Sequence, residues 1–348
     1  MSIQAGKRAI GAGEPCFIAA EIGINHNGDV ELARRMIAAA AEAGADAVKF
    51  QNYRTEDFIS DRSLVHRYVS RGREVVESQY ELFKRCELST QALTSLAKFT
   101  REQGLEFFST PTSETGIDEL VAAGATLVKN GSDFLTHLPL IRAMAKSGLP
   151  CVISTGMATI EEIDDAVYTF RAAGGRGLVL LHCTSAYPTA AKDVHLRKLP
   201  ALATSFHCPV GLSDHTLGIQ AALGAVALGA VFVEKHFTTD RDLPGPDQAM
   251  SCDPAELREL VQGIRALEAM LGSPVIGPTP AEAASRASFR LSCVARKDMA
   301  AGTTLEPASI AFRRPGTGFP PKALEWISGR ALTRPVQSGA VLDSEDFT

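Results

Sequence analysis

Short apolar runs alternate with amphipathic segments over the first three quarters of the chain. Continuous apolar and β-branched character of this kind is typical of parallel strands that are covered on both faces. The segments between the runs are rich in alanine and have helical spacing. Eight such runs occur, namely FIAAEIGIN, DAVKFQ, LEFFST, TLVKNGS, PCVIST, GLVLLHCTS, CPVGLSDHT and VFVEKHF. The alternation predicts an α/β fold, a (β/α)8 TIM barrel.

The amphipathic segments predict helices, some of them with recognisable ends. Asp29 can cap a first helix that Gly44 ends, and Thr159 followed by Glu162 is a capping-box pattern. Further helices are expected near residues 91–103, 114–123, 137–147, 159–173, 217–228 and 254–271. The connection 186–203 stays unassigned. The polar excursion 53–88 is longer than a βα connection needs, so we expect it at the active-site face.

The length of the chain indicates a second, smaller domain. Its 348 residues exceed the roughly 250 that such a barrel takes. The segment GSPVIGPTPAEAAS, which begins at residue 272, carries three prolines and two glycines and lacks periodicity, so we expect a linker at 272–286. The catalytic barrel is then expected at 1–271. Residues 287–348 contain short strands and Gly/Pro turns and predict a small β-rich module.

The overall composition is that of an ordinary soluble enzyme, with 45% hydrophobic and 22% charged residues. A formal net charge of −5 argues against a nucleic-acid surface, although a local pocket for an anion stays possible. No run approaches the roughly 20 apolar residues of a membrane span, and the first residues lack the apolar core of a signal peptide. Seven cysteines without a C-x-x-C pair indicate reduced thiols. We therefore expect a cytoplasmic protein without membrane or nucleic-acid partners.

Chemically capable side chains stand at the end of every apolar run. Because the carboxyl ends of the strands of a barrel meet at one face, these side chains are expected to surround one pocket. They are Glu21, Lys49, Ser109 with Thr110, Lys129 with Ser132, Ser154, His182, His215 and His236.

His215 and His236 end the last two runs, which are neighbours about 4.8 Å apart in a barrel. Their imidazoles can therefore converge on one divalent metal, and two imidazoles with oxygen ligands suit Mn, Fe, Co or Zn better than Ca. Asp247 can supply a carboxylate to the metal, to its water or to a substrate hydroxyl. The alternative is that each histidine is only a hydrogen-bonded polar residue in a loop.

Lys49 and Lys129 each lie inside an apolar run, where a charge is costly unless an anion or a carboxylate meets it. Hydroxyl groups stand near them, from Thr110, Ser132 and Ser154. Two lysines with hydroxyl groups fit a clamp for a small, doubly anionic ligand. Two other interpretations stay open: a Schiff base on one lysine, as in class I aldolases, or an ion pair with Glu21 inside the barrel.

Six short motifs, taken together and in this order, resemble the sialic acid synthase family over nearly the whole chain. They are EIGINHNG from residue 21, KFQ from 49, FSTP from 108, GLSDHT from 211, EKHFT from 234 and GPD from 245. The tail segment RRPGTGFPP resembles the antifreeze-like (SAF, β-clip) domain attached to those synthases. The resemblance implies a C–C bond-forming transferase that condenses phosphoenolpyruvate with an open-chain N-acylated amino sugar, giving a nine-carbon α-keto acid and phosphate.

The resemblance also assigns roles to individual residues. The phosphoenolpyruvate ligands would be Lys49, Thr110, Lys129, Ser132, Ser154 and Ser213. The metal, Mn(II) first with Mg(II) or Co(II) as alternatives, would be held by His215 and His236. The sugar would contact Glu21, Gln51, Ser185, Tyr187, Asp247 and Arg314. The catalytic set would be Glu21, Lys49, Lys129, His215, His236 and Asp247.

Two departures from the family pattern bear on the acceptor sugar. Phe134 stands where an acidic residue is common, with Asp133 as an imperfect substitute, and the segment CTSAYP from residue 183 lacks a common asparagine. N-acetylmannosamine, giving N-acetylneuraminate, is the first expected acceptor. A 2,4-diacetamido-trideoxyhexose, giving legionaminate or pseudaminate, is the second.

The resemblance further implies a domain-swapped homodimer, in which the SAF domain brings Arg314 to the active site of the partner. Taken alone, Arg314 would be read as a solvated surface arginine. Two remote alternatives remain at this stage: a metal-dependent barrel hydrolase or aldolase that does not use phosphoenolpyruvate, and a non-catalytic carbohydrate-binding protein.

Overall fold

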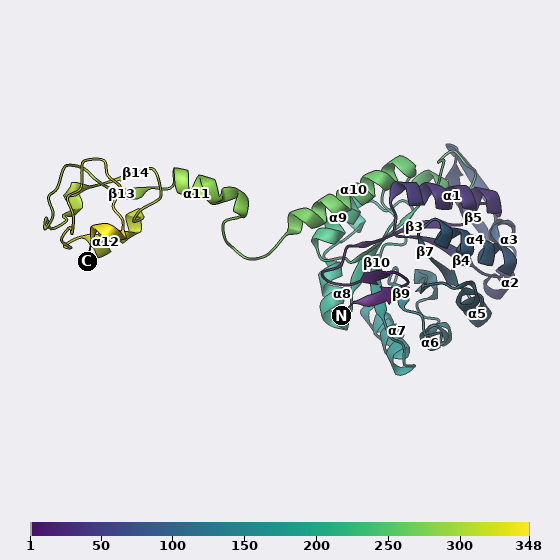
Figure 1. Cartoon of the computed structure of the whole chain (residues 1–348). Coiled ribbons are helices and arrows are strands. Elements are labelled where there is room, and N and C mark those ends of the chain that lie inside the picture. Colours follow the sequence, from purple (N-terminus) through teal and green to yellow (C-terminus); the bar gives the residue numbers. More distant parts are fainter. Residues whose placement is uncertain (1, 348) are drawn as a thin grey trace. The chain divides into compact units, whose positions relative to one another are not determined.

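The protein consists of two compact units, Met1–Gly272 and Ser273–Thr348. They are described from a computed structural model that covers residues 2–347. Each unit is considered by itself (Figure 1).

The first unit is a closed barrel of eight parallel strands, in the order β10-β11-β12-β3-β4-β7-β8-β9. This confirms the predicted TIM barrel. The strands are β3 Phe17–Gly23, β4 Ala47–Asn52, β7 Glu106–Pro111, β8 Leu127–Asn130, β9 Cys151–Ser154, β10 Leu178–Cys183, β11 Val210–Asp214 and β12 Phe232–His236.

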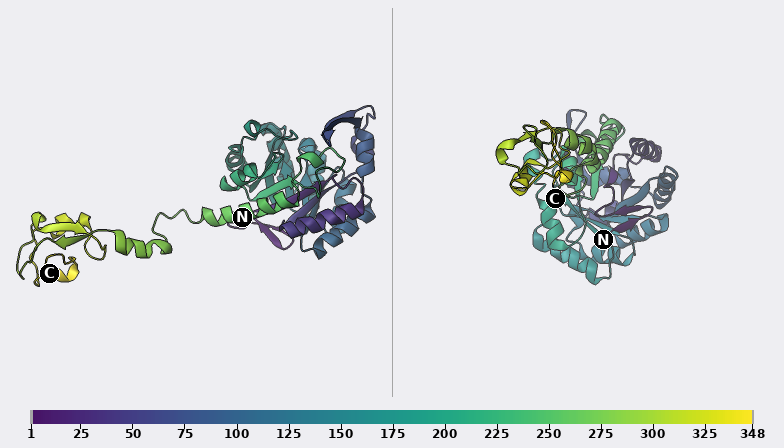
Figure 2. Two further views of the ribbon diagram at one scale, coloured as in Figure 1. Left: turned by 90° about the horizontal axis from the view of Figure 1, so that it is seen from above. Right: turned by 60° about the vertical axis from the view of Figure 1, so that its left-hand side comes forward.

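Helices surround the barrel strands, as two further views also show (Figure 2). They are α1 Val30–Ala43, α4 Thr90–Glu102, α5 Glu114–Ala123, α6 Leu138–Lys146, α7 Ile160–Ala172, α8 Lys198–Phe206, α9 Gln220–Ala227 and α10 Pro254–Leu271. The Asp29 carboxylate accepts from the first backbone N–H groups of α1, and Gly44 ends that helix in the left-handed region. The capping box of Thr159 and Glu162 begins α7. Helix α8 fills the connection that the sequence left unassigned.

The amino-terminal end of the barrel interior is apolar and closed. Phe17 stacks on Phe232 with ring centroids 5.0 Å apart, and Phe108 meets Phe232 edge-on. A hairpin of β1 Ile3–Ala5 and β2 Arg8–Ile10 packs into the same buried cluster. Burial of these apolar groups supplies the hydrophobic stabilisation of this end. The polar strand ends are therefore left at the opposite, carboxyl-terminal end.

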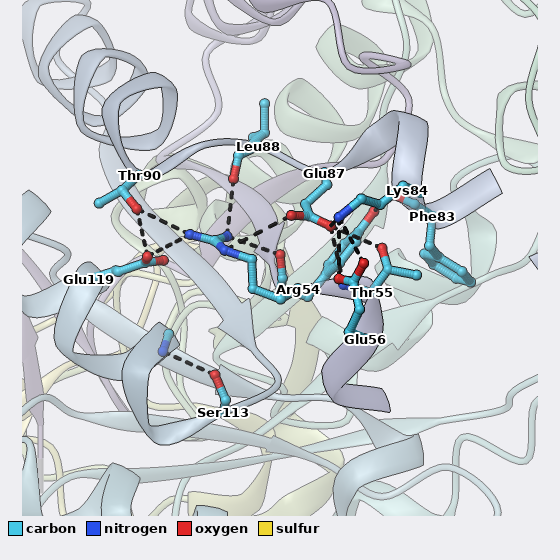
Figure 3. A network of polar contacts seen from close by, with 12 residues as sticks. Arg54, Thr55, Glu56, Phe83, Lys84, Glu87, Leu88, Thr90, Ser113 and Glu119 are labelled. Atoms are coloured by element: carbon cyan, nitrogen blue, oxygen red, sulfur yellow. Dashed lines mark hydrogen bonds and ion pairs between the residues drawn. The ribbon is translucent and has the colours of Figure 1, made fainter. Parts of the chain in front are cut away.

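The polar excursion after β4 forms a small subdomain at that carboxyl-terminal end. It contains α2 Thr55–Phe58, a hairpin of β5 Val65–Ser70 and β6 Arg73–Ser78, and α3 Gln79–Cys86. Arg54 ties the excursion to the barrel helices: its guanidinium pairs with Glu119 on α5 at 2.7 Å and donates to the Leu88 carbonyl at 3.3 Å (Figure 3). The excursion is therefore fixed to the barrel at its carboxyl-terminal end.

The second unit is small and has its own core. It contains α11 Ala283–Phe289, an antiparallel pair of β13 Ser292–Ala295 and β14 Ile310–Arg313, and α12 Leu324–Ile327. Isolated bridges such as Met299↔Val336 extend the pairing. Its core comprises Cys293, Ala295, Met299, Leu305, Ile310, Ile327, Leu332, Val336, Leu342 and Phe347. Helix α11 begins inside the segment expected as a linker.

Several single turns of 3₁₀ helix complete the two units. They are η1 Ser132–Phe134, η2 Ala191–Asp193, η3 Gln248–Met250, η4 Pro280–Glu282, η5 Pro307–Ser309, η6 Pro321–Ala323 and η7 Ser344–Asp346. No helix among residues 2–347 combines the length and the apolar character needed to cross a membrane.

Candidate active site

The carboxyl-terminal mouth of the barrel holds most of the predicted site residues on adjacent strands. Glu21 ends up beside Lys49 because their positions on β3 and β4 are paired, and Lys49 pairs in turn with Phe108, two residues before Thr110. Side chains at alternate positions of a strand point to the same face. Lys49 and Gln51 therefore share one face of β4, while Lys129 projects from β8.

Four buried charges meet inside the mouth. Lys49 Nζ lies 2.8 Å from Glu21 Oε1 and 3.8 Å from Glu234 Oε1. Lys129 Nζ lies 3.5 Å from the same oxygen of Glu234. All four side chains are at most 5% exposed. The ion pair of Lys49 with Glu21 is therefore present, and a second carboxylate stands between the two lysines.

Glu234 is a site residue that the sequence analysis missed. It lies two positions before His236 on β12, so that both side chains face the barrel interior. Lys235 between them faces the other way and pairs with Asp214 at 2.8 Å. The period of two along EKH was the signal that could have identified Glu234.

The environments of the two carboxylates push their pKa values apart. Burial raises the pKa of Glu21, with Lys49 opposing the shift. Burial also acts on Glu234, but Lys129 and Lys49 outweigh it and lower its pKa. The pKa of Lys49 is raised because Glu21 and Glu234 outweigh its burial. Glu234 is thus the fixed negative charge of the cluster, and Glu21 is the group able to hold a proton.

Hydroxyl groups line the same mouth. Thr110 Oγ1 accepts from Lys49 Nζ at 3.2 Å, and Ser213 Oγ donates to Glu234 Oε1 at 3.1 Å. Ser154 Oγ is buried and has no hydrogen-bond partner among the described residues. Gln51 Nε2 donates to Glu21 Oε1 at 3.4 Å. These groups leave hydrogen-bonding capacity that a polar ligand could satisfy.

Ser132 and Ser185 approach each other around Gly156, at the end of β9. Ser132 Oγ accepts from the Gly156 backbone N–H at 3.0 Å. A Cβ atom at position 156 would lie 2.4 Å from Ser185 Oγ and 2.7 Å from Ser132 Oγ. Only glycine therefore allows both hydroxyl groups to face this backbone.

The two predicted metal-binding histidines lie side by side. The ring centroids of His215 and His236 are 5.4 Å apart, and Tyr187 lies over His215 at 4.2 Å. His215 Nδ1 is 2.9 Å from the Thr184 carbonyl oxygen, which leaves Nε2 free to act as a ligand. Asp247 Oδ2 lies 3.8 Å from His236 Nδ1.

The arrangement fits a divalent ion held by two imidazoles. His236 Nδ1 is buried and has no hydrogen-bond partner within residues 2–347. Burial, followed by the charge of His215, lowers the pKa of His236, so its imidazole is neutral as a ligand must be. Within the same residues, three or more histidine, cysteine or carboxylate side chains are nowhere grouped as a ready-made metal cage. Substrate or water oxygens would therefore have to complete the coordination.

Two further titrations belong to this corner of the site. Burial raises the pKa of Asp247 to about 6, against the pull of His215 and Lys49. The pKa of His215 is raised, because contacts with Cys183 and the Thr184 carbonyl outweigh its burial. A raised pKa favours the protonated ring, so an ion at His215 would have to compete with a proton.

Two predicted residues lie apart from this cluster. His182 Nε2 is within hydrogen-bonding distance of the Val194 carbonyl, which accounts for that histidine without a ligand. Arg314 belongs to the second unit, where it is exposed and stands over the Phe289 ring at 5.1 Å. Its expected contact with sugar stays a prediction.

Comparisons with known proteins agree with this architecture. A model of the NeuB family matches residues 36–275, and a model of the SAF domain matches residues 292–348. The N,N'-diacetyllegionaminic acid synthase of Legionella pneumophila is 40% identical over 336 residues, which are 95% of this chain and 94% of that protein. The N-acetylneuraminate-9-phosphate synthase of Mus musculus is 35% identical and covers 93% of this chain and 90% of its own length.

A solved structure extends the match to the fold. The N-acetylneuraminic acid (sialic acid) synthetase of Leptospira borgpetersenii, crystallised with citrate, has a TM-score of 0.74 at 34% identity and covers 82% of this chain and 95% of that one. The resemblance drawn from the six motifs is confirmed, as is the SAF domain at the carboxyl terminus. This chain therefore belongs to the NeuB family of enzymes, which form carbon–carbon bonds and whose members named here are synthases of nonulosonic acids.

Proposed function

We propose that this protein condenses phosphoenolpyruvate with N-acetylmannosamine, giving N-acetylneuraminate and phosphate. A 2,4-diacetamido-trideoxyhexose, giving legionaminate or pseudaminate, is the second candidate acceptor. The observation that carries the reaction type is the pair of buried lysines, Lys49 and Lys129, whose ammonium groups lie 3.8 and 3.5 Å from one oxygen of Glu234.

The charge balance of the mouth favours an anionic ligand. When Glu21 takes up a proton while Glu234 stays ionised, Lys49, Lys129, Glu21 and Glu234 together carry one net positive charge. A buried positive charge is stabilised by an anion that brings its own hydrogen-bond acceptors. The hydroxyl groups of Thr110, Ser132, Ser154 and Ser213 would complete the binding of a phosphate and a carboxylate.

The same electrostatics disfavour the Schiff-base aldolase. A lysine that forms an imine must be deprotonated, which requires a lowered pKa. The pKa of Lys49 is raised, because Glu21 and Glu234 hold its ammonium form. A non-catalytic scaffold would likewise give no reason to bury four ionisable groups at a barrel mouth.

The proposed condensation has a simple proton balance. The enol carbon of phosphoenolpyruvate bonds to the sugar aldehyde carbon, and the aldehyde oxygen takes up a proton. Water then adds to the carbon that carries the phosphate and loses one proton, which balances the proton taken up by the aldehyde oxygen. As the C–O bond to phosphate breaks, the new hydroxyl group becomes the keto oxygen and its remaining proton goes to the departing phosphate. Glu21 and Asp247 both have raised pKa values and are the groups that we propose for these transfers.

His215 and His236 are proposed to hold the divalent ion, Mn(II) first, with Mg(II) or Co(II) as alternatives. When bound, such an ion polarises a carbonyl oxygen as a Lewis acid. The Thr184 carbonyl fixes the ring of His215, and Asp247 stands beside His236. Gln51, Ser185 and Tyr187, which border the same mouth, would contact the sugar.

The relatives are named for different nonulosonic acids. One is named for N,N'-diacetyllegionaminic acid and the other for N-acetylneuraminate 9-phosphate. Phe134 and the segment CTSAYP, at the two departures from the family pattern, offer less polar contact to a sugar than the residues common there. This favours testing the less hydroxylated diacetamido sugar alongside N-acetylmannosamine.

The decisive measurement is phosphate release from phosphoenolpyruvate with Mn(II), run in parallel with the two sugars and repeated after EDTA. We expect release with one sugar and its loss with the chelator. His236→Ala should abolish the metal-dependent turnover, with His182→Ala as a control for the loss of a buried imidazole. If turnover continues in EDTA and borohydride traps the imine intermediate, the aldolase is supported instead.

We further propose that the protein works as a domain-swapped homodimer in the cytoplasm. In it, the SAF domain of one chain would cover the active site of the other and supply Arg314. Arg314 is exposed on its own unit, and so is available to a partner. All seven cysteines are free, which fits a reducing compartment.

A further inference from the structure

The segment that carries Asp247 leaves the barrel after β12 and returns to it. The base of the segment is closed by two backbone hydrogen bonds, from Cys252 N to the His236 carbonyl at 2.8 Å and from Thr238 N to the Cys252 carbonyl at 3.0 Å. The Asp247 carboxylate caps no backbone N–H of its own segment, and its contact with His236 Nδ1, at 3.8 Å, is longer than a hydrogen bond. Its position is therefore set through the backbone of its own segment.

A buried amide from the neighbouring strand holds that backbone. Asn25 follows β3, and its Nδ2 donates to the Phe237 carbonyl and to Ser251 Oγ, both at 2.9 Å. Ser251 Oγ in turn donates to the Asp247 carbonyl at 2.6 Å. Asn25 is 1% exposed and Ser251 is fully buried. One amide thus joins the first residue of the segment to the carbonyl of Asp247.

A second side chain completes this circuit of hydrogen bonds, which joins Asn25, Ser251 and Gln248. Gln248 Nε2 donates to the Asn25 backbone carbonyl at 2.8 Å, and Gln248 Oε1 accepts from Thr238 Oγ1 at 2.5 Å. Gln248 and Thr238 are both fully buried. Buried polar networks of this kind favour one arrangement, because each alternative leaves a polar group without a partner.

The chemistry of the circuit requires an amide at position 25. Both hydrogens of Asn25 Nδ2 are donated, whereas its Oδ1 has no partner among the described residues. An aspartate of the same shape would turn an oxygen toward the Phe237 carbonyl, so that two acceptors face each other. Ser251 could satisfy that oxygen only by releasing the Asp247 carbonyl.

We propose that Asn25 is the positioning residue that sets Asp247 beside His236, acting through Ser251. The assignment rests on the proposed function, because it is the condensation that gives Asp247 a role. Asn25 touches neither the histidines nor the lysines in the hydrogen bonds of the described residues, so its effect on catalysis must pass through the segment it holds.

The test is Asn25→Asp with Asn52→Asp as the matched control. Asn52 is also 1% exposed and ends β4, and its Nδ2 donates to the Gly116 carbonyl at 2.9 Å while its Oδ1 has no partner in the described part of the chain. Amide hydrogen exchange of the segment 239–250 should speed up in Asn25→Asp and stay at the wild-type rate in Asn52→Asp. Wild-type exchange rates in Asn25→Asp would overturn the proposal.

A double-mutant cycle with Asp247→Asn separates positioning from general destabilisation. In the wild-type background, we expect Asn25→Asp to lower kcat about tenfold, or about 1.4 kcal/mol. In the Asp247→Asn background, the same change should lower kcat less than about twofold, because there is no carboxylate left to misplace. An equal loss in both backgrounds would show that Asn25 does not act through Asp247. If the wild-type enzyme releases no phosphate, the proposed function fails, and the exchange comparison still decides whether Asn25 holds the segment.

Discussion

Four ionisable side chains lie together inside the barrel mouth, so the protonation of each depends on the charges of the others. Glu234 lies between Lys49 and Lys129, and this contact keeps its charge. Removing one partner of a buried ion pair leaves the other charge uncompensated, at a cost of about 3–5 kcal/mol. We therefore expect Glu234 to balance the charge of the two lysines when no anionic ligand is bound.

Glu234→Gln should destabilise the free protein by about 3–5 kcal/mol and make its stability depend strongly on an added anion. In the variant, Lys129 has lost its carboxylate and Lys49 keeps only Glu21, so the two ammonium groups attract phosphoenolpyruvate more strongly than they do in the wild type. The rise in unfolding temperature on adding phosphoenolpyruvate should thus be larger in the variant than in the wild type.

Asp214→Asn is the control for this prediction, because it removes the carboxylate that pairs with Lys235, a lysine that faces away from the barrel interior. It should also destabilise the protein, but the anion should raise its unfolding temperature only as much as in the wild type. Equal anion effects in Glu234→Gln and Asp214→Asn would contradict the role given to Glu234.

His26 makes stability depend on pH. It is fully buried, and burial lowers its pKa from 6.5 to about 4. Its folded pKa is lower than its unfolded one, so the unfolded chain binds an extra proton between these values. The contribution of the neutral His26 ring to the free energy of unfolding is fully present above pH 6.5. It is lost as the pH falls toward 4, by about 1.4 kcal/mol per pH unit and about 3 kcal/mol in total.

Denaturant unfolding of the wild type and His26→Gln across this range measures the effect. The variant has no titrating ring at position 26, so the difference in free energy of unfolding between the two proteins should narrow steadily from pH 7 to pH 4.5. Parallel profiles would show that His26 is already free to protonate in the folded protein.

At the scale of elements, the strands were predictable because eight parallel strands covered on both faces require continuous apolar runs. The hairpin β5–β6 was not, since its exposed residues include charged ones such as Arg67 and Glu74 that hide the strand pattern. Helix α8 begins two residues before Pro200, where a proline is tolerated in the first turn but reads as a break. Helix α11 follows the capping box of Thr279 and Glu282, a short signal inside a proline-rich segment.

Site residues were predictable from the sequence only where a residue at a strand end could be recognised by its chemical type. Lys49, Lys129, His215 and His236 follow from strand order, because neighbouring strands bring their ends together. Predicting Glu234 would also have required the direction in which its side chain points from β12. The circuit of Asn25, Ser251 and Gln248 joins residues more than 220 positions apart and depends on how one loop folds back, which no local pattern encodes.

The turn from β9 into α7 brings the backbone of Gly156 close to two hydroxyl groups. In Gly156→Ala, the new methyl group would meet Ser185 Oγ and Ser132 Oγ well inside contact distance. Since one or both serines must move, we expect about 1–3 kcal/mol of destabilisation and a higher KM for phosphoenolpyruvate, for the sugar or for both, according to which serine moves. Gly277→Ala is the control, because no atom lies within 4 Å of a Cβ at that position. If neither KM changes in Gly156→Ala, at least one of Ser132 and Ser185 is not a ligand.

At the scale of the whole molecule, the proposed exchange of SAF domains can be tested by mixing two inactive proteins. His236→Ala damages the barrel of its own chain, whereas Arg314→Ala would damage the site of the partner chain. A mixed dimer then has one site with both defects and one site with none. If chains exchange freely in an equal mixture, half of the dimers are mixed, so that about a quarter of the wild-type activity should return. If Arg314 serves the barrel of its own chain, every site keeps a defect and mixing restores nothing. The assay uses sugar at a concentration far below its KM. Under this condition the Arg314→Ala protein alone should be inactive enough for the difference to be measured.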